Sequence, residues 1–180
     1  MKRLVQYFFP ENNGDVLKAF VKEVIKINKQ YPYINYGGCG VFAERLYDKL
    51  KLFGYKPKIV VLVNSKQCFA DSMKMLDERG LDYYWINRTE GFSHIMVKVN
   101  GYYVDSEGMY KSQADMPSKW RYYDIYEKGM KIGSLRKCTA DERFWNDRFD
   151  RYDIPAIENR LDSIYRRIAK KIKTNSLVVS

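Results

Sequence analysis

The chain has 180 residues, of which 46% are hydrophobic, and 32 Lys and Arg against 22 Asp and Glu give it a formal net charge of +10. This length and composition argue against global disorder and predict one domain, residues 1–180, with a packed core. No run of about 20 apolar residues is present, and no small-residue cleavage site follows the first residues, so we expect a soluble cytoplasmic protein without a membrane span.

The cysteine and histidine content argues against a metal site. Cys39, Cys68 and Cys138 form no CxxC pair, and their odd number does not favour a disulfide scaffold. With one histidine besides, the chain is short of zinc ligands, so we expect no cofactor. Free thiols are typical of a reducing cytoplasm, and one of them can have a special role.

The N-terminal half predicts two helices and a buried strand. Apolar residues recur every three or four positions from Asp15 to about Asn28, as on the core-facing stripe of a helix. After a loop rich in Gly and aromatic residues, the same spacing predicts a second helix that begins at Gly38–Cys39 and ends at Gly54. The β-branched run at 58–64 predicts a buried strand.

A weaker helix over 68–79 and a strand over 81–87 are expected next. Two short runs, 93–99 and 102–106, are joined by Asn100-Gly101. An Asn-Gly pair between such runs is the strongest short-range hairpin signal, because both turn positions tolerate positive φ.

Beyond Gly108 the spacing of apolar residues becomes irregular. Two helices are then expected near the C-terminus. A capping box predicts one over about 140–151, and Pro155 suits the first turn of another that runs to about Thr174. The predicted class is therefore α+β, with leading helices, an antiparallel sheet and trailing helices. We expect a core at about 14–110 and a C-terminal helical extension at about 139–174.

Cys39 is the candidate nucleophile, because a Gly-rich turn leads into a helix N-terminus at this position. The positive end of a helix dipole favours a thiolate, which is the form that attacks. Gly37, Gly38 and Gly40 leave room for a substrate and for backbone N–H groups that face a developing oxyanion. The alternative is a small buried Cys in a tight turn.

His94 and Asp105 are the candidates for base and orienting carboxylate. His94 is the one histidine of the chain. A two-residue turn places Asp105 opposite Met96, and therefore diagonal to His94 on the same face of the hairpin. A carboxylate at that position can orient an imidazole and stabilise its charged form. Glu107, directly opposite His94 in this register, is a rival for that role, and Asp105 could instead be a turn-flanking carboxylate.

The segments GGCGVFAERLYDKLKLFGYKPKIVVLV and HIMVKVNGYYVDSEG resemble the core of the transglutaminase-like branch of papain-like cysteine enzymes. The resemblance covers roughly residues 35–108, and the compact size is similar to that of small microbial or viral members; for a viral member the location would be the host cytoplasm. It implies Cys39 as nucleophile at the start of a helix packed on an antiparallel sheet, with His94 as base and Asp105 as its partner. Ile95 and Met96 stand where transglutaminases usually have Trp.

These residues predict a cysteine-nucleophile hydrolase or acyl-transfer enzyme of peptidase, isopeptidase or amidase type, acting on a protein or peptide through a thioester. A first alternative is a transglutaminase or a deamidase of protein glutamine, distinguished by whether an added amine enters the product. A second is a non-catalytic basic module on a papain-like fold that binds nucleic acid or protein. The excess of Lys and Arg over Asp and Glu is compatible with weak association with nucleic acid or anionic surfaces. The solvent-exposed face of a helix would equally explain the basic run at 166–173.

Two further sets of candidates concern the oxyanion and the substrate groove. The oxyanion candidates are the backbone N–H of Cys39 and the side chains of Asn35 and Gln67. The groove candidates, which core or edge-strand packing would also explain, are Tyr36, Gly37, Gly38, Tyr84 and Trp85.

Overall fold

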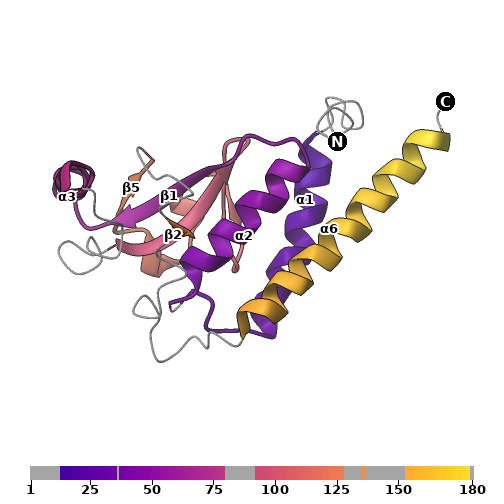
Figure 1. Ribbon diagram of the computed structural model, residues 1–180, viewed down its shortest axis with the longest axis horizontal. Helices are drawn as coiled ribbons and strands as arrows, with labels where there is room; N and C mark the ends of the chain where they lie inside the picture. The colour runs from indigo at the N-terminus through magenta and orange to yellow at the C-terminus, as the bar shows by residue number, and fades with distance from the viewer. Residues whose placement is uncertain (1–12, 36, 80–91, 128–134, 137–152, 179–180) are drawn as a thin grey trace.

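The computed structural model describes residues 13–35, 37–79, 92–127, 135–136 and 153–178. Within these ranges the protein is α+β, with four α-helices and one five-stranded antiparallel sheet (Figure 1). The predicted class is therefore confirmed. No helix in the described part of the chain is both long enough and apolar enough to cross a membrane.

The helices lie close to where the spacing of apolar residues placed them. The first predicted helix is α1 followed by a 3-10 turn, η1, and the second begins at Cys39 as expected. The strand predicted over 81–87 and the helix predicted over 140–151 lie outside the described residues. The helical elements are α1 (Asn13–Val24), η1 (Ile25–Lys29), α2 (Cys39–Leu52), α3 (Lys66–Arg79), η2 (Gln113–Asp115), η3 (Ser118–Trp120) and α6 (Asp153–Val178).

The sheet has the strand order β4-β3-β2-β1-β5. Its centre is the predicted hairpin, in which Asn100 and Gly101 have φ of 48° and 78° and Val97 pairs with Val104. The predicted turn and register are therefore confirmed. The strands are β1 (Lys58–Val63), β2 (Phe92–Val99), β3 (Tyr102–Val104), β4 (Met109–Tyr110) and β5 (Asp124–Tyr126).

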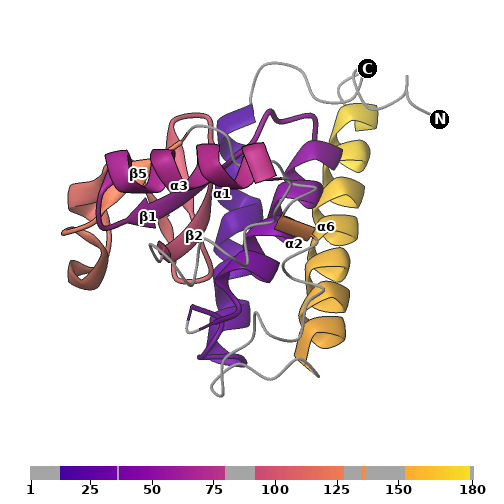
Figure 2. The same cartoon turned by 60° about the vertical axis from the view of Figure 1, so that its left-hand side comes forward.

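One face of the sheet carries the main core. Helix α2 packs against β1 and β2, and α1 and α6 pack beside it (Figures 1 and 2). Phe53, just after α2, makes edge-to-face ring contacts with Phe20 of α1 at 5.0 Å and with Tyr165 of α6 at 4.7 Å. Helix α6 also buries Leu161 completely in this cluster, so what was expected as an extension shares the main core.

The opposite face of the sheet is covered by the segment between β4 and β5. A second cluster forms there, in which Met116 and Trp120 pack over Leu62 and Met96. The Gln113 side chain donates hydrogen bonds to the carbonyl groups of residues 120, 121 and 123 and so ties the segment together. This covering layer lies on the face toward which His94 points.

We expect Leu161→Ala to lower the free energy of unfolding by about 2–5 kcal/mol, because the side chain is fully buried between α6 and the rest of the core. Urea unfolding followed by circular dichroism would measure it. Arg160→Ala is the matched control, since Arg160 is exposed on the same helix turn and its loss should change stability by less than about 0.5 kcal/mol. Equal effects of the two substitutions would mean that α6 does not share the core.

Candidate active site

Cys39 is the first residue of α2 and lies against the main core. Gly37 has φ of 129°, a backbone conformation that favours glycine, and Gly38 is the N-cap of the helix. The N–H of Phe42 donates to the Gly38 carbonyl at 2.9 Å, which closes the first helical turn. The N–H groups of residues 39–41, before this bond, have no carbonyl partner within the helix, and they are the donors available around the thiol.

His94 is fully buried in β2, where it pairs with Leu62 of β1. Its Nε2 lies 2.9 Å from Oδ2 of Asp105. Because the carboxylate accepts, Nε2 carries the proton in this bond. The neutral ring then has its lone pair on Nδ1, which is buried and has no hydrogen-bond partner among the described residues.

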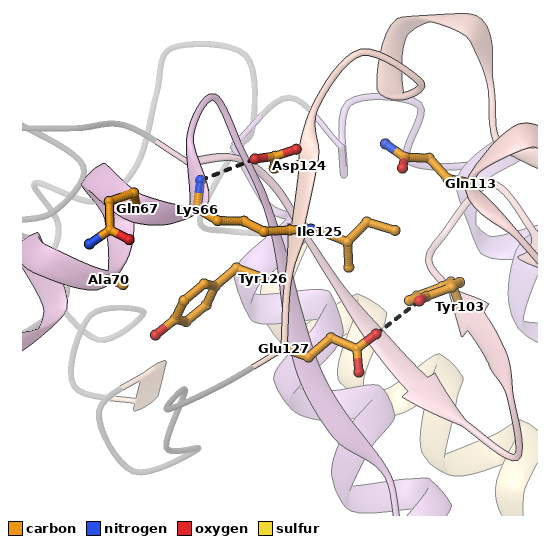
Figure 3. A pocket seen from close by; sticks show the side chains of 9 residues that line it. All are labelled: Lys66, Gln67, Ala70, Tyr103, Gln113, Asp124, Ile125, Tyr126 and Glu127. Atoms are coloured by element: carbon orange, nitrogen blue, oxygen red, sulfur yellow. Dashed lines mark hydrogen bonds between the residues drawn. The ribbon is translucent and has the colours of Figure 1, made fainter.

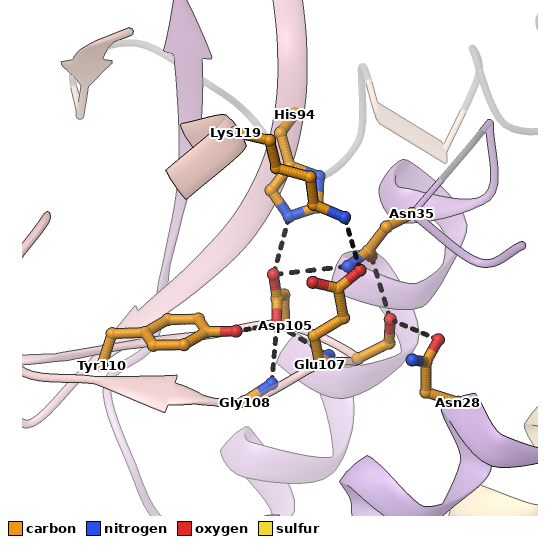
Figure 4. A network of polar contacts seen from close by, with 9 residues as sticks. Asn28, Asn35, His94, Asp105, Glu107, Gly108, Tyr110 and Lys119 are labelled. Carbon is orange, nitrogen blue, oxygen red and sulfur yellow. Dashed lines mark hydrogen bonds and ion pairs between the residues drawn. The ribbon is translucent and has the colours of Figure 1, made fainter. Parts of the chain in front are cut away.

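Asp105 receives five hydrogen bonds, which together form the polar network of Figure 4. Oδ2 accepts from His94 and, at 3.4 Å, from Nδ2 of Asn35. Oδ1 accepts from the backbone N–H groups of Glu107 and Gly108 at 2.8 and 2.9 Å, and from the Tyr110 hydroxyl at 3.2 Å. This carboxylate is therefore held in place from three sides.

The strand that precedes Asp105 is shorter than predicted. We expected it to continue to residue 106, but β3 ends at Val104. The Asp105 carboxylate accepts the N–H groups of the next residues, and its own N–H donates to the Gly108 carbonyl at 3.1 Å. A side chain that competes in this way for backbone groups ends a strand, and here it turns the carboxylate toward His94.

A chain of three polar side chains connects the Asp105 turn to the loop before Cys39. The Ser106 hydroxyl lies 3.0 Å from Oδ1 of Asn35 and 3.4 Å from Oδ1 of Asn28 (Figure 4). Asn35 is 5% exposed, and its amide is engaged by Asp105 and Ser106. Asn35, one of the expected oxyanion donors, therefore helps to hold the carboxylate.

The charge state of the imidazole reflects these contacts. Burial lowers the pKa of His94, but the hydrogen bond with Asp105 and the nearby Cys39 thiol outweigh it and raise the pKa to about 9. Burial also raises the pKa of Tyr110, and the neighbouring Asp105 carboxylate adds to this effect. The phenol therefore stays protonated and donates a hydrogen bond to Asp105. The raised pKa makes His94 a strong proton acceptor beside Cys39 and favours its imidazolium form.

Trp120 covers the imidazole and was not anticipated from the sequence. The two rings are stacked with centroids 4.3 Å apart and planes 3° from parallel. Lys119 lies 4.8 Å from the Trp120 ring and pairs with Glu107 at 2.7 Å. Glu107, the rival for the orienting role, is thereby engaged elsewhere. A lone Trp in an irregular segment carries no local signal of this contact.

The remaining candidates lie elsewhere or outside the described residues. Gln67 is in α3, where its amide donates to Asp71 at 2.9 Å. It lines a pocket of about 650 Å³ between α3, β3 and β5, to which Cys39, His94 and Asp105 do not contribute (Figure 3). In the described ranges no three His, Cys, Asp or Glu side chains are grouped to hold a metal ion. The candidates Tyr36, Tyr84 and Trp85, and the third thiol, Cys138, lie outside the described residues.

The raised pKa of His94 can be measured directly, because one histidine gives one imidazole resonance. We expect an NMR titration midpoint near pH 9 in the wild type. In Asp105→Asn the midpoint should fall well below the wild-type value, since the hydrogen bond and charge of the carboxylate no longer oppose burial. Glu107→Gln is the control and should leave the midpoint near the wild-type value, because Glu107 pairs with Lys119.

The same shift has a consequence for stability. The folded-state pKa lies above 6.5, so protonated His94 stabilises the fold fully below pH 6.5, and this contribution is lost as the pH rises through about 9. In the NMR titration, a midpoint near pH 6.5 for wild-type His94 would contradict the raised pKa of this residue.

Comparison with known proteins gives no relative from which a function could be transferred: no family model, curated protein or solved structure matches this chain. The resemblance to the transglutaminase-like branch therefore stays a prediction. The structure shows an α+β fold in which buried His94 is hydrogen-bonded to Asp105, and helix-initial Cys39 is near enough to raise the pKa of His94.

Proposed function

We propose that the protein is a cysteine-dependent acyl-transfer or hydrolytic enzyme in which Cys39, His94 and Asp105 form the catalytic triad. The observation that carries the proposal is the state of the imidazole. One ring nitrogen is bound to a carboxylate at 2.9 Å, and the other is buried, has no hydrogen-bond partner among the described residues, and belongs to a ring close to a thiol. A purely structural histidine usually has both nitrogens satisfied.

In the proposed reaction the Cys39 sulfur attacks the carbonyl carbon of an amide. The thiol proton passes to Nδ1 of His94, and the imidazolium then protonates the leaving amine as the carbon–nitrogen bond breaks. The product is a thioester on Cys39. Water or a second amine attacks the thioester carbon and gives its proton to His94. The carbon–sulfur bond then breaks, and His94 returns the proton to the Cys39 sulfur, which restores the thiol.

Asp105 supports both halves of this cycle through geometry. By accepting from Nε2 it fixes the tautomer that leaves Nδ1 free, and its negative charge stabilises the imidazolium formed when His94 takes the proton. The backbone N–H groups at the start of α2 are the oxyanion donors in this scheme, because Asn35 is engaged with Asp105.

The proposal makes a sharp prediction for thiol reactivity, because the two described cysteines differ in exposure. Cys39 is 8% exposed, whereas Cys68 is exposed on α3. If access alone decided the rate, Cys68 would react first with iodoacetamide. We expect Cys39 to react at least about tenfold faster at pH 7, because His94 can take its proton. Peptide mapping by mass spectrometry after timed labelling would measure both rates in one sample.

The control is His94→Gln, in which Cys39 should become slower than Cys68 while the labelling of Cys68 stays unchanged. Cys68→Ser should leave the labelling of Cys39 unaffected. If Cys68 is the faster thiol in the wild type, and His94→Gln has no effect on Cys39, the triad does not activate the thiol and the proposal is wrong.

Trp120 is assigned a positioning role, since its ring excludes water from the His94–Asp105 hydrogen bond. We expect Trp120→Leu to slow the labelling of Cys39 by up to about tenfold, since an aromatic pair contributes about 0.5–1.5 kcal/mol beyond its buried area. Its pH–rate profile should also shift, which loss of stability alone would not cause. Trp120→Phe retains a stacking ring and should recover most of the rate. Identical profiles for the Leu and Phe variants would exclude this role.

A further inference from the structure

A basic surface on the outer sides of α1, η1 and α6 lies apart from the Asp105 network. Helices α1 and α6 pack side by side, with the C-terminal half of α6 next to the N-terminal half of α1 (Figures 1 and 2). Within residues 15–29 and 166–173, the exposed Lys and Arg residues number nine, against two acidic residues, Asp15 and Glu23. We call this the basic face, and it consists of Lys18, Lys22, Lys26, Lys29, Arg166, Arg167, Lys170, Lys171 and Lys173.

The spacing of these residues sets the charges in two rows. On α1, Lys18 and Lys22 are four residues apart and share one side of the helix about 6 Å apart, and Lys26 follows four residues later in η1. On α6, Arg166, Lys170 and Lys173 recur at intervals of four and three and form the second row.

Glu23 shows that cations of the two helices are close enough to share one anionic group. One of its carboxylate oxygens binds Lys26 at 2.7 Å, and the other binds Arg167 of α6 at 2.6 Å. Lys26, and to a lesser degree Arg167, hold the pKa of this carboxyl below its usual value. An oxyanion can therefore bridge cations of both helices. Among the described residues, no ion pair is formed by Lys18, Lys22, Arg166 or Lys170.

The basic face lacks what a membrane or a protein partner would need. The apolar stripes of α1 and α6 are buried in the core, and none of the exposed large hydrophobic side chains of the described residues is on these two helices. Interfacial helices insert an apolar face into lipid, and protein interfaces obtain most of their affinity from buried aromatic or apolar anchors. Binding to a phosphate backbone requires only well-placed cations.

We propose that the basic face binds the phosphodiester backbone of nucleic acid without reading its base sequence. Rows of evenly spaced cations suit a linear, evenly charged polymer, and one phosphate can take the bridging position that Glu23 demonstrates between the helices. The surface shares no residue with the proposed triad, so the two proposals can fail independently.

The test is fluorescence anisotropy with labelled single-stranded RNA and duplex DNA of about 20 nucleotides per strand, between about 50 and 200 mM salt. The affinity should fall linearly on a log–log plot against salt. Lys22→Ala with Lys170→Ala, one residue from each row, should weaken binding by about tenfold or more and reduce the salt slope by about 2. The RNA and DNA arms decide which polymer is preferred.

The matched control is Lys74→Ala with Lys111→Ala, which removes the same charge from α3 and from the residue after β4. It should change the affinity by less than about twofold, since these residues lie off the basic face. Glu23→Gln should strengthen binding, because the competing carboxylate is gone, and Cys39→Ser should bind like the wild type. Equal losses in both double variants, no measurable binding, or binding only to phosphatidylserine vesicles would overturn the proposal.

Discussion

The buried carboxylate of Asp105 is the group on which the arrangement of the site depends. A carboxylate taken out of water is costly unless its lone pairs are satisfied, and here five donors satisfy them. Its two oxygens have separate tasks. Oδ1 organises the turn after β3, while Oδ2 orients His94 and holds Asn35. One side chain therefore ends a strand, closes a turn and selects the tautomer of an imidazole.

The same carboxylate connects the two halves of the site. Asn35 lies four residues before Cys39, and it links Asp105 and Ser106 to the loop that leads into α2. The start of α2 and the sheet are thereby held to one another by polar contacts as well as by the core. On the other face of the sheet, Trp120 covers the ring of His94. With water excluded, each of these hydrogen bonds is electrostatically stronger and an error in any one of them is more costly.

Much of this arrangement could be predicted because its determinants are local. The Asn100-Gly101 turn fixes the hairpin register, and the register places Asp105 beside His94. The Gly-rich turn before Cys39 and the apolar spacing after it define the start of α2. These signals depend on backbone conformation and helical period, which the sequence determines within a few residues.

The parts that could not be predicted depend on contacts between distant segments. Strand β5 has three residues and exists only because it pairs with β1. Trp120 reaches His94 from an irregular segment, and Asn35 is bound to a turn 70 residues away. In the sequence Asn35 is one polar residue in a loop, equally suited to binding an oxyanion. The end of β3 could not be predicted for a different reason. The Asp105 side chain accepts the backbone N–H groups of the next residues, and these bonds take the place of hydrogen bonds between strands.

The hairpin that carries His94 and Asp105 also determines when the proposed chemistry can first appear during folding. Hairpins form within about 1–10 μs, since their strands are neighbours in sequence, whereas contacts between distant segments form later. Cys39 belongs to a helix far from this hairpin along the chain, and it meets the imidazole only after the helix layer and the sheet have joined. A nascent or partly unfolded chain would therefore carry an unactivated thiol. Under the proposed mechanism, reactivity at Cys39 would therefore mark completed folding.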